Sequence, residues 1–262
     1  MKLKSKKSFA NGIVYCLELE DRLLVETTDT FLPYYTKDAI GKKQNILTDG
    51  NLGSRDERWM IGVSTMSGCP VRCKFCATGQ MKKYRNLTSA EIVAQVIYAI
   101  ENAPEEYSPS KSKEFKINYT RMGEPFLNIE AVRDAVEAIT LLYPNTHHYI
   151  STIGIKGSDF SWIKGNITLQ ISLHSFITEK RNWLIPFKNK LSIEELGTIR
   201  TDSNLKTTLN LTLVDKEDFD INMLKKHFDK EHFFIKLSPI NPNEVSSKNN
   251  LNNGVIKQFN LK

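Results

Sequence analysis

The chain has 262 residues, of which 40% are hydrophobic and 25% charged, and its formal net charge is +6. These proportions are typical of globular proteins and exclude a disordered or fibrous chain. No run of 18 apolar residues occurs, which excludes a transmembrane helix. No apolar segment follows the basic start at residues 1–7, so we expect no secretory signal. The sequence therefore predicts a cytoplasmic globular protein with no membrane partner.

Strand and helix patterns alternate from residue 59 onward. Six short runs rich in Ile, Val, Tyr and Thr predict strands over residues 59–65, 115–120, 148–152, 168–173, 207–214 and 233–238. Helical patterns lie between them over residues 89–102, 129–142, 193–201 and 219–229, with a weaker one over 159–164. Such alternation is typical of parallel sheets, and six strands are too few for a full eight-stranded barrel. We therefore predict an α/β fold, namely an open partial (β/α)6 TIM-like barrel.

The sequence on either side of the barrel is different. Residues 12–19 and 23–27 predict a short β-hairpin, and residues 41–56 are rich in Gly, Asn and Asp, which indicates a loop. The last twenty residues are rich in Asn and Ser, with little apolar periodicity. We predict three parts: a β-rich N-terminal extension over 1–58, a core over 59–242 and a short polar tail over 243–262.

Cysteines are clustered in one part of the chain. Cys16 stands alone, whereas the other three have the spacing C-x3-C-x2-C: Cys69, Cys73 and Cys76. Clustered thiols indicate metal or redox chemistry rather than a disulfide framework. Three thiolates on an iron–sulfur cluster leave one iron open to a substrate group. A zinc site would need a fourth ligand, for which the candidates are His147, His148 and His174. The spacing favours a cluster and leaves zinc as an alternative.

Positive charge is concentrated in the same region. Residues 70–90 contain five basic side chains and no acidic one: Arg72, Lys74, Lys82, Lys83 and Arg85. A concentrated basic segment is typical of proteins with a polyanionic partner such as RNA. A solvated lysine-rich loop has the same composition, so charge alone does not decide between the two.

Short blocks of residues, in order between positions 60 and 242, carry a resemblance to a known family. The blocks are CKFCATG (73–79), RNLT (85–88), EIVAQV (91–96), MGEP (122–125), STIG (151–154), ISLH (171–174) and LSPINP (237–242). Together they resemble the RlmN/Cfr family of rRNA adenine methyltransferases, within the radical S-adenosyl-L-methionine (SAM) superfamily. The resemblance implies that the predicted barrel is of the radical SAM type.

The resemblance also implies cofactors and a reaction. Cys69, Cys73 and Cys76 would hold a [4Fe–4S] cluster, whose fourth iron binds the amine and carboxylate of SAM. One electron then cleaves SAM to methionine and a 5′-deoxyadenosyl radical, which removes a hydrogen atom from the substrate. A reductase or flavodoxin-type donor would supply the electron. RNA would be the partner of the basic segment 70–90.

By resemblance, the SAM pocket consists of residues that follow or end the predicted strands. These residues are Gly123, Glu124, Ser151, Ser172, Leu173, His174 and Asn241. Gly123 would allow close approach of the backbone, and Glu124 would pair with the methionyl ammonium. The two serines would bind ribose or carboxylate, Asn241 an adenine edge, and His174 would line the pocket. Each residue taken alone is also typical of a turn, a strand end or a structural histidine.

The chain departs from the family at the positions that carry the methyl group. The resemblance implies one methyl-carrying cysteine near the C-terminus and one resolving cysteine seven residues before the cluster. The second position is Gly62, and no cysteine follows Cys76. Arg121 replaces the glycine usual before the MGEP block. Cys16 is a candidate replacement carrier, although a lone cysteine in an apolar strand is typically a core residue. Asp49 lies near where the family has an acidic proton acceptor.

Two classes of function follow from these residues. The first is a radical SAM enzyme in RNA (rRNA adenine) modification that has lost the two-cysteine methyl-transfer route, or one with a non-RNA substrate. The second is a non-catalytic protein that senses redox state or SAM through its cluster. The sequence leaves the catalytic residues, the atom attacked and the oligomeric state open.

Overall fold

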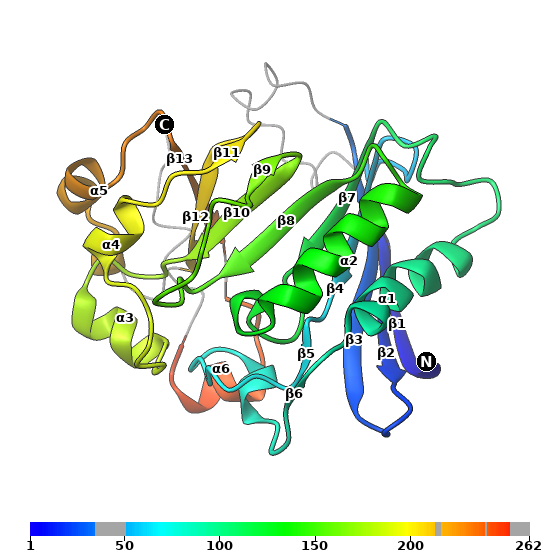
Figure 1. Cartoon of the computed structure of the whole chain (residues 1–262). Helices are drawn as coiled ribbons and strands as arrows, with labels where there is room; N and C mark the ends of the chain where they lie inside the picture. The colour runs from blue at the N-terminus through cyan, green and yellow to red at the C-terminus, as the bar shows by residue number, and fades with distance from the viewer. Residues whose placement is uncertain (35–50, 213–215, 239, 252–262) are drawn as a thin grey trace. The chain divides into compact units, whose positions relative to one another are not determined.

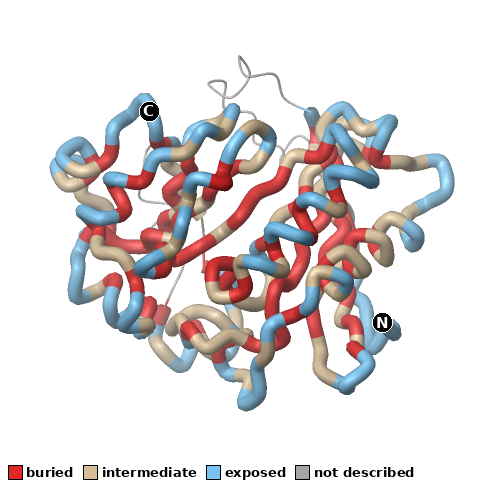
Figure 2. Tube along the Cα trace, in the orientation of Figure 1, coloured by how far each residue is buried: buried red, intermediate tan, exposed pale blue. Residues whose placement is uncertain are grey.

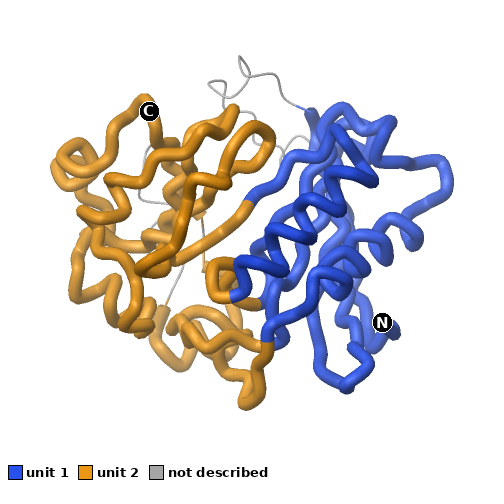
Figure 3. The backbone as a smooth tube through the Cα atoms, viewed as in Figure 1, with its two compact units in different colours: residues 1–67, 86–122, 128–149 blue, residues 68–85, 123–127, 150–262 orange. Residues whose placement is uncertain are grey.

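The computed structural model describes residues 1–34, 51–212, 216–238 and 240–251 (Figure 1). The chain divides into two compact units, and each unit is assembled from separate stretches of sequence (Figure 3). Unit 1 comprises residues 1–67, 86–122 and 128–149, and unit 2 comprises residues 68–85, 123–127 and 150–262. In the described part of the chain, no helix is long and apolar enough to cross a membrane.

Unit 1 contains the N-terminal strands and the first strand–helix repeats. Its elements are β1 (Lys2–Phe9), β2 (Gly12–Glu18), β3 (Leu24–Leu32), β4 (Arg58–Val63), β5 (Met66–Ser67), α1 (Ser89–Glu101), β7 (Glu114–Tyr119) and α2 (Ile129–Leu142). The first half of β8 (His147–Thr152) and the last residue of β6 (Arg85–Asn86) also belong to it. The strand order is β1-β2-β3-β4-β7-β8. The pairs from β1 to β4 are antiparallel and β4–β7 is parallel, so the predicted hairpin is confirmed as β2–β3.

Two amphipathic helices cover the strands of unit 1. Helix α1 begins at a capping box, in which Thr88 accepts from the backbone N–H of Glu91 and the Glu91 carboxylate accepts from that of Thr88. It packs against α2 and against β3 and β4 (Figure 1). Figure 2 shows buried stretches along these strands and helices, and the buried apolar residues on them include Trp59, Ile61, Ile92, Val96, Phe115, Ile117, Val132 and Ile139. Burial of each such side chain contributes about 1.5–3 kcal/mol.

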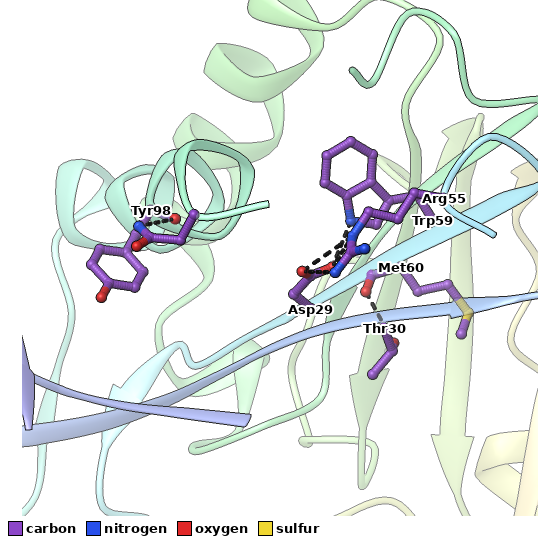
Figure 4. Close-up of polar contacts among 7 residues, drawn as sticks. Asp29, Thr30, Arg55, Trp59, Met60 and Tyr98 are labelled. Atoms are coloured by element: carbon purple, nitrogen blue, oxygen red, sulfur yellow. Dashed lines mark hydrogen bonds and ion pairs between the residues drawn. The ribbon is translucent and has the colours of Figure 1, made fainter. Parts of the chain in front are cut away.

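A buried ion pair connects three segments of unit 1. The Asp29 carboxylate on β3 is fully buried and accepts from Nε of Arg55 at 3.2 Å and from its Nη2 at 2.6 Å. The indole Nε1 of Trp59 on β4 donates to the same carboxylate at 2.7 Å (Figure 4). The Arg55 guanidinium also lies 5.0 Å from the ring centre of Phe31. Every charge in this network has a partner, which is what a structural buried ion pair requires.

Unit 2 contains the remaining strand–helix repeats. Its elements are η2 (Ala77–Gln80), η3 (Pro125–Leu127), the second half of β8, β9 (Lys164–Gly165), β10 (Ile167–Ser172), α3 (Thr178–Leu184), α4 (Ile193–Gly197), β11 (Asp202–Ser203), β12 (Thr207–Thr212), η4 (Lys216–Asp218), α5 (Ile221–His227), β13 (Phe233–Ser238) and α6 (Glu244–Lys248). Its main strands follow the order β8-β10-β12-β13, with parallel pairs β10–β12 and β12–β13. The six predicted barrel strands are therefore confirmed as β4, β7, β8, β10, β12 and β13.

Several details differ from the prediction. Residues 159–164 do not form the predicted helix: residues 161–162 form a turn and Lys164 begins β9, while the Asp159 carboxylate accepts from the backbone N–H of Ser161 and so favours the turn. Strand β1, helix α3 and helix α6 were not predicted. Helix α6 lies within the predicted polar tail, where the Asn243 side chain caps its start. The boundaries at residues 58 and 242 stay a prediction.

Candidate functional site

All ten predicted site residues belong to unit 2. They lie in the segment after β5, in the segment after β7, at the ends of β8 and β10, and after β13. In α/β barrels the functional residues lie at the carboxyl ends of the strands. The sites predicted from sequence thus fall in loops of the kind that carry function in this fold class.

Backbone hydrogen bonds fix the conformation of the cysteine loop. The N–H of Cys76 donates to the carbonyl of Cys73 at 3.1 Å, which makes a tight turn. The N–H of Lys74 donates to the carbonyl of Leu184, at the end of α3, at 2.9 Å. Arg72 adopts a left-handed φ of 58°, and its backbone lies against Gly79, where a Cβ atom would come within 2.7 Å. Gly79 is therefore required for the loop to close on itself.

Two asparagines that flank α6 hold the same loop from another side. Nδ2 of Asn243 donates to the carbonyl of Phe75 at 3.0 Å. Nδ2 of Asn249 donates to the carbonyl of Lys74 at 2.9 Å. The sequence interpretation assigned this region to a polar tail and missed both residues. The signal available was the Asn-x-x-Ser pattern at residues 243–246, which is a helix cap.

The thiols of the loop lie close enough to influence one another. Burial raises the pKa of Cys69 to about 11 and the pKa of Cys73 well above its usual range, and the neighbouring Cys76 and Glu124 add to both shifts. Backbone N–H groups donate to the Cys69 sulfur and oppose the shift. Neutral thiols must release protons when they bind a metal. In the described residues no three Cys, His, Asp or Glu side chains form a preassembled metal site.

The donor set fits an iron–sulfur cluster with three protein ligands. Three thiols on one fixed loop, with N–H groups directed at a sulfur, are what such a cluster uses. For the alternative of zinc, His148 is not a suitable fourth ligand. Its ring nitrogens contact the Tyr119 hydroxyl at 3.1 Å and the Thr140 hydroxyl at 2.9 Å within unit 1. The assignment of Cys69, Cys73 and Cys76 as ligands stays a prediction.

Glu124 is a buried carboxylate without a cationic partner in the described part of the chain. It follows Gly123, whose φ of 106° favours glycine. The Glu124 carboxylate accepts from the backbone N–H of Ile153 at 2.9 Å and from that of Phe126 at 3.2 Å. Burial raises its pKa to about 7, and the hydrogen bonds from Thr152, Ile153 and Phe126 limit that rise. A ligand ammonium at this position would gain an ion pair in a low-dielectric site.

His174 connects β12 to the cysteine loop. Its φ of 65° is left-handed, its backbone N–H donates to the carbonyl of Asn210, and its Nδ1 accepts from the N–H of Thr212 at 3.2 Å. Its ring packs edge-on against Phe75, with ring centres 4.7 Å apart. Burial lowers its pKa to about 3. His174 is therefore neutral, and because Nδ1 accepts a hydrogen bond, Nε2 carries the hydrogen.

The other predicted pocket residues have fewer contacts. Ser151 and Ser172 are half-buried at the ends of β8 and β10, and neither side chain has a hydrogen bond within the described residues. Leu173 is buried, and its N–H donates to the carbonyl of Asn210. Asn241 is exposed, and its carbonyl accepts from Asn243. Their role in binding stays a prediction.

Arg181 on α3 was also missed. It is 2% exposed, and it donates through Nη2 to the carbonyl of Ile153 and through Nη1 to that of Leu191, each at 2.8 Å. Burial lowers its pKa to about 10, and the Cys73 thiol opposes that change. No carboxylate pairs with it in the part of the chain that the structure describes. The signal in the sequence was a charged residue one turn before the buried Leu184.

The two departures from the family, at residues 62 and 121, meet in unit 1. A Cβ atom on Gly62 would lie 2.4 Å from Oγ1 of Thr28 and 2.9 Å from Cδ of Arg121. Arg121 extends across Gly62 and pairs with Glu26. At the place where the resemblance implies a resolving cysteine, a side chain would therefore have to displace Thr28 or Arg121.

Two candidates of the sequence interpretation remain, and the structure tests neither of them. Cys16 is half-buried on β2, on the opposite face from the buried Tyr15 and Leu17. Asp49 lies outside the described residues.

Comparison with known proteins identifies relatives of the chain. No family model matches the chain. It is 34% identical over 192 residues to a probable dual-specificity RNA methyltransferase RlmN of Pseudothermotoga lettingae, which covers 68% of this chain and 54% of the relative. The RlmN of Thermosipho melanesiensis is 39% identical over 140 residues, 51% of this chain and 39% of the relative. The chain is a homologue of the RlmN proteins. The resemblance read from the sequence blocks is thereby confirmed.

A solved structure confirms the fold. A radical SAM methyltransferase from Sphaerobacter thermophilus superposes with a TM-score of 0.66 at 24% identity, over 92% of this chain and 67% of that chain. The predicted partial barrel of the radical SAM type is therefore correct. The chain spans about half the length of the RlmN relatives described above.

Proposed function

We propose that this RlmN-like chain is a radical SAM enzyme that binds a [4Fe–4S] cluster and SAM and acts on RNA. The observation that carries the proposal is the arrangement within unit 2. There the cysteine loop, the buried Glu124 carboxylate and the neutral His174 are linked by the contacts described above. The names of the relatives as RNA methyltransferases support the substrate class.

Each residue has a distinct role in this proposal. Cys69, Cys73 and Cys76 hold the cluster. When bound, the cluster supplies the electron that cleaves SAM to methionine and a 5′-deoxyadenosyl radical. Glu124 holds the methionyl ammonium, and Gly123 lets the backbone approach it. The remaining predicted pocket residues, named above, orient the rest of SAM and exclude water.

The basic segment supplies the contact with RNA. Arg72, Lys82 and Lys83 are exposed, and Tyr84 among them is 52% exposed. Exposed cations bind phosphates, and an exposed aromatic ring stacks on an unpaired base. The segment is continuous with the cysteine loop, which would bring RNA to the cluster. A reductase or flavodoxin-type protein would donate the electron, and we expect the protein to be cytoplasmic.

We further propose that the reaction does not use a resolving thiol at residue 62. The side chains of Thr28 and Arg121 lie where a Cβ atom on Gly62 would be, and glycine itself carries no thiol. The chemistry would then consist of hydrogen abstraction without methyl transfer by the two-cysteine route.

The test is an anaerobic reconstitution with iron and sulfide, followed by SAM, dithionite and total ribosomal RNA. Mass spectrometry quantifies 5′-deoxyadenosine and S-adenosylhomocysteine together. We expect 5′-deoxyadenosine without S-adenosylhomocysteine, lost in Cys73→Ala and retained in the matched control Cys16→Ala. Detection of both products would show that methylation persists by another route. If a protein with a loaded cluster forms neither product, the proposal of an enzyme is overturned and a non-catalytic sensor is favoured.

A further inference from the structure

A small cavity in unit 2 is lined by positive charge. Its volume is about 140 Å³, and its lining includes four cationic side chains and no acidic one. The cations are Lys156, Arg181, Lys188 and Lys190. Lys156 follows β8 in the chain, and the other three belong to α3 and the segment after it.

Two of these cations are buried next to each other. Arg181 is 2% and Lys190 is 8% exposed. Burial lowers the pKa of Lys190, and the charge on Arg181 lowers that pKa further. Lys190 donates to the carbonyl of Phe187 at 3.0 Å, and the buried Nε of Arg181 has no hydrogen-bond partner. Two like charges in a site of low dielectric are costly unless an anion joins them.

None of the described residues around the cavity supplies that anion. Glu195 lies 3.7 Å from Lys156, but both side chains are about half exposed and Glu195 is not part of the lining. The Cys73 thiol influences Arg181 and Lys190, yet a single thiolate would not balance four cations. Lys188 is exposed and has no ion pair in the described residues. The site therefore has an excess of positive charge around a small, partly open cavity.

We propose that this cavity binds one phosphate group. Its volume corresponds to about four or five waters at ~30 Å³ each, enough for a tetrahedral oxyanion with some water. It is well below the ~300 Å³ of sites for larger ligands, so a nucleoside would not enter. The same chemistry is offered by a backbone phosphate of RNA and by free inorganic phosphate.

The position of the cavity favours a phosphate of RNA. Arg181 donates to the carbonyl of Ile153, and the N–H of Ile153 donates to Glu124. Arg181, which lines the cavity, and Glu124, in the predicted SAM site, thus both bind the backbone of one residue, Ile153. A phosphate bound here would fix an RNA strand next to the reacting centre, an inference that rests on the proposed function.

A second basic cavity in unit 2 provides a matched control. It has a volume of about 480 Å³, and its lining includes Lys225, Lys226 and Lys230 together with the acidic Asp229. It lies at the end of α5 and before β13, which is the amino end of that strand. Lys225 and Lys188 are both exposed lysines without an ion pair in the described ranges. Replacement of either lysine by alanine removes one positive charge from unit 2, but each replacement does so at a different cavity.

The experiment compares Lys188→Ala with Lys225→Ala, using a fluorescent single-stranded RNA of about twelve nucleotides, a length that exceeds the footprint of a small site. Anisotropy is measured over a range of salt concentrations, and inorganic phosphate binding is measured by calorimetry. We expect Lys188→Ala to weaken RNA binding about tenfold, which corresponds to about 1.4 kcal/mol. The slope of log affinity against log salt should fall by ~0.7, the value for one phosphate contact with a single strand. Lys225→Ala should leave the RNA affinity and the salt slope unchanged. Lys188→Arg, which keeps the positive charge, should keep both at their wild-type values.

The outcomes separate this inference from the proposed function. In one outcome, Lys188→Ala loses inorganic phosphate binding and the wild-type protein does not bind RNA. This result would support a phosphate-binding cavity for free phosphate, and it would overturn the proposed RNA partner. RNA binding lost in Lys82→Ala/Lys83→Ala and intact in Lys188→Ala would support the RNA partner and overturn the cavity. If Lys188→Ala and Lys225→Ala bind RNA and inorganic phosphate equally well, the proposal of a phosphate-binding cavity is also overturned. Thermal melting confirms that each variant is folded.

Discussion

Arg55 in unit 1 and Arg181 in unit 2 are both almost fully buried, and their surroundings differ in one respect. Arg55 makes a two-pronged contact with the buried Asp29 carboxylate, which also accepts from Trp59. Arg181 reaches only backbone carbonyls, and a second cation, Lys190, lies nearby. Within unit 1 the buried Arg55 is neutralised by Asp29, whereas no described residue of unit 2 neutralises Arg181.

The difference separates a structural charge from one that is available to a ligand. A buried ion pair whose groups are all hydrogen-bonded is complete when the chain has folded. Among the described residues, Arg181 has no carboxylate partner and Glu124 has no cationic partner. Each of them can therefore form an ion pair with a bound ligand. Unit 2 contains both kinds of incomplete charge, and it also contains every predicted site residue.

The largest expected effect concerns the complete pair. Asp29→Ala leaves the Arg55 guanidinium buried without a counter-charge and removes the acceptor of Trp59. We expect a loss of about 3–5 kcal/mol in the free energy of unfolding, measured by chemical denaturation. Arg181→Met should cost much less, because it also relieves the repulsion with Lys190.

The double variant Asp29→Leu/Arg55→Met is the control for this comparison. Replacement of both charges by apolar groups removes the unpaired charge, so the double variant should recover part of the stability lost in Asp29→Ala. The distinction between the two arginines breaks down if Arg181→Met costs as much as Asp29→Ala.

The next effect is a pH dependence that originates at Glu124. In the folded protein its pKa is about 7, and in the unfolded chain it returns to about 4.5. Between these values the folded state keeps a proton that the unfolded state releases, so stability falls as the pH rises through this range. The fall is about 3 kcal/mol in the absence of ligand, at 1.36 kcal/mol per unit.

Denaturation at several pH values between 4.5 and 8 measures this effect. Glu124→Gln cannot titrate, so its stability should lack this fall. Addition of SAM, whose ammonium pairs with the ionised carboxylate, should reduce the slope in the wild-type protein. A wild-type profile with the same shape as that of Glu124→Gln would contradict the assignment.

Gly62 gives a smaller effect that tests the closed position in unit 1. Gly62→Cys places Cβ against Thr28 and Arg121, and overpacking of this kind costs about 1–3 kcal/mol. Two of its three nearest atoms belong to Arg121, so the addition of Arg121→Ala should recover part of the loss. Arg121→Ala alone removes a partly exposed ion pair, worth less than about 1 kcal/mol. Strictly additive losses in the double variant would show that Arg121 does not occupy this place.

The sequence was sufficient for the features that depend on local pattern. The six barrel strands follow from alternating apolar runs, and α1 from a capping box and an apolar face. It was insufficient where one segment is held by another that is distant along the chain. Nothing local shows that Asn249 reaches the carbonyl of Lys74, that Arg121 covers Gly62, or that Arg181 and Lys190 share a cavity. These contacts depend on how the loops fold back, which periodicity does not encode.

The smallest effect concerns the support of the cysteine loop by α6. Asn249→Ala removes one hydrogen bond to the carbonyl of Lys74, worth about 1 kcal/mol. Cys73 is half-buried, and we expect its thiol to react mainly when the loop opens. Its alkylation by iodoacetamide should then become about fivefold faster, in proportion to the increased population of the open loop. Global stability should change little, since the loss is confined to this loop. Asn222→Ala, at an exposed position on α5, is the matched control and should alkylate at the wild-type rate. An unchanged rate in Asn249→Ala would mean that the contacts with Leu184 and Asn243 alone hold the loop closed, and that α6 does not support the cluster ligands through Asn249.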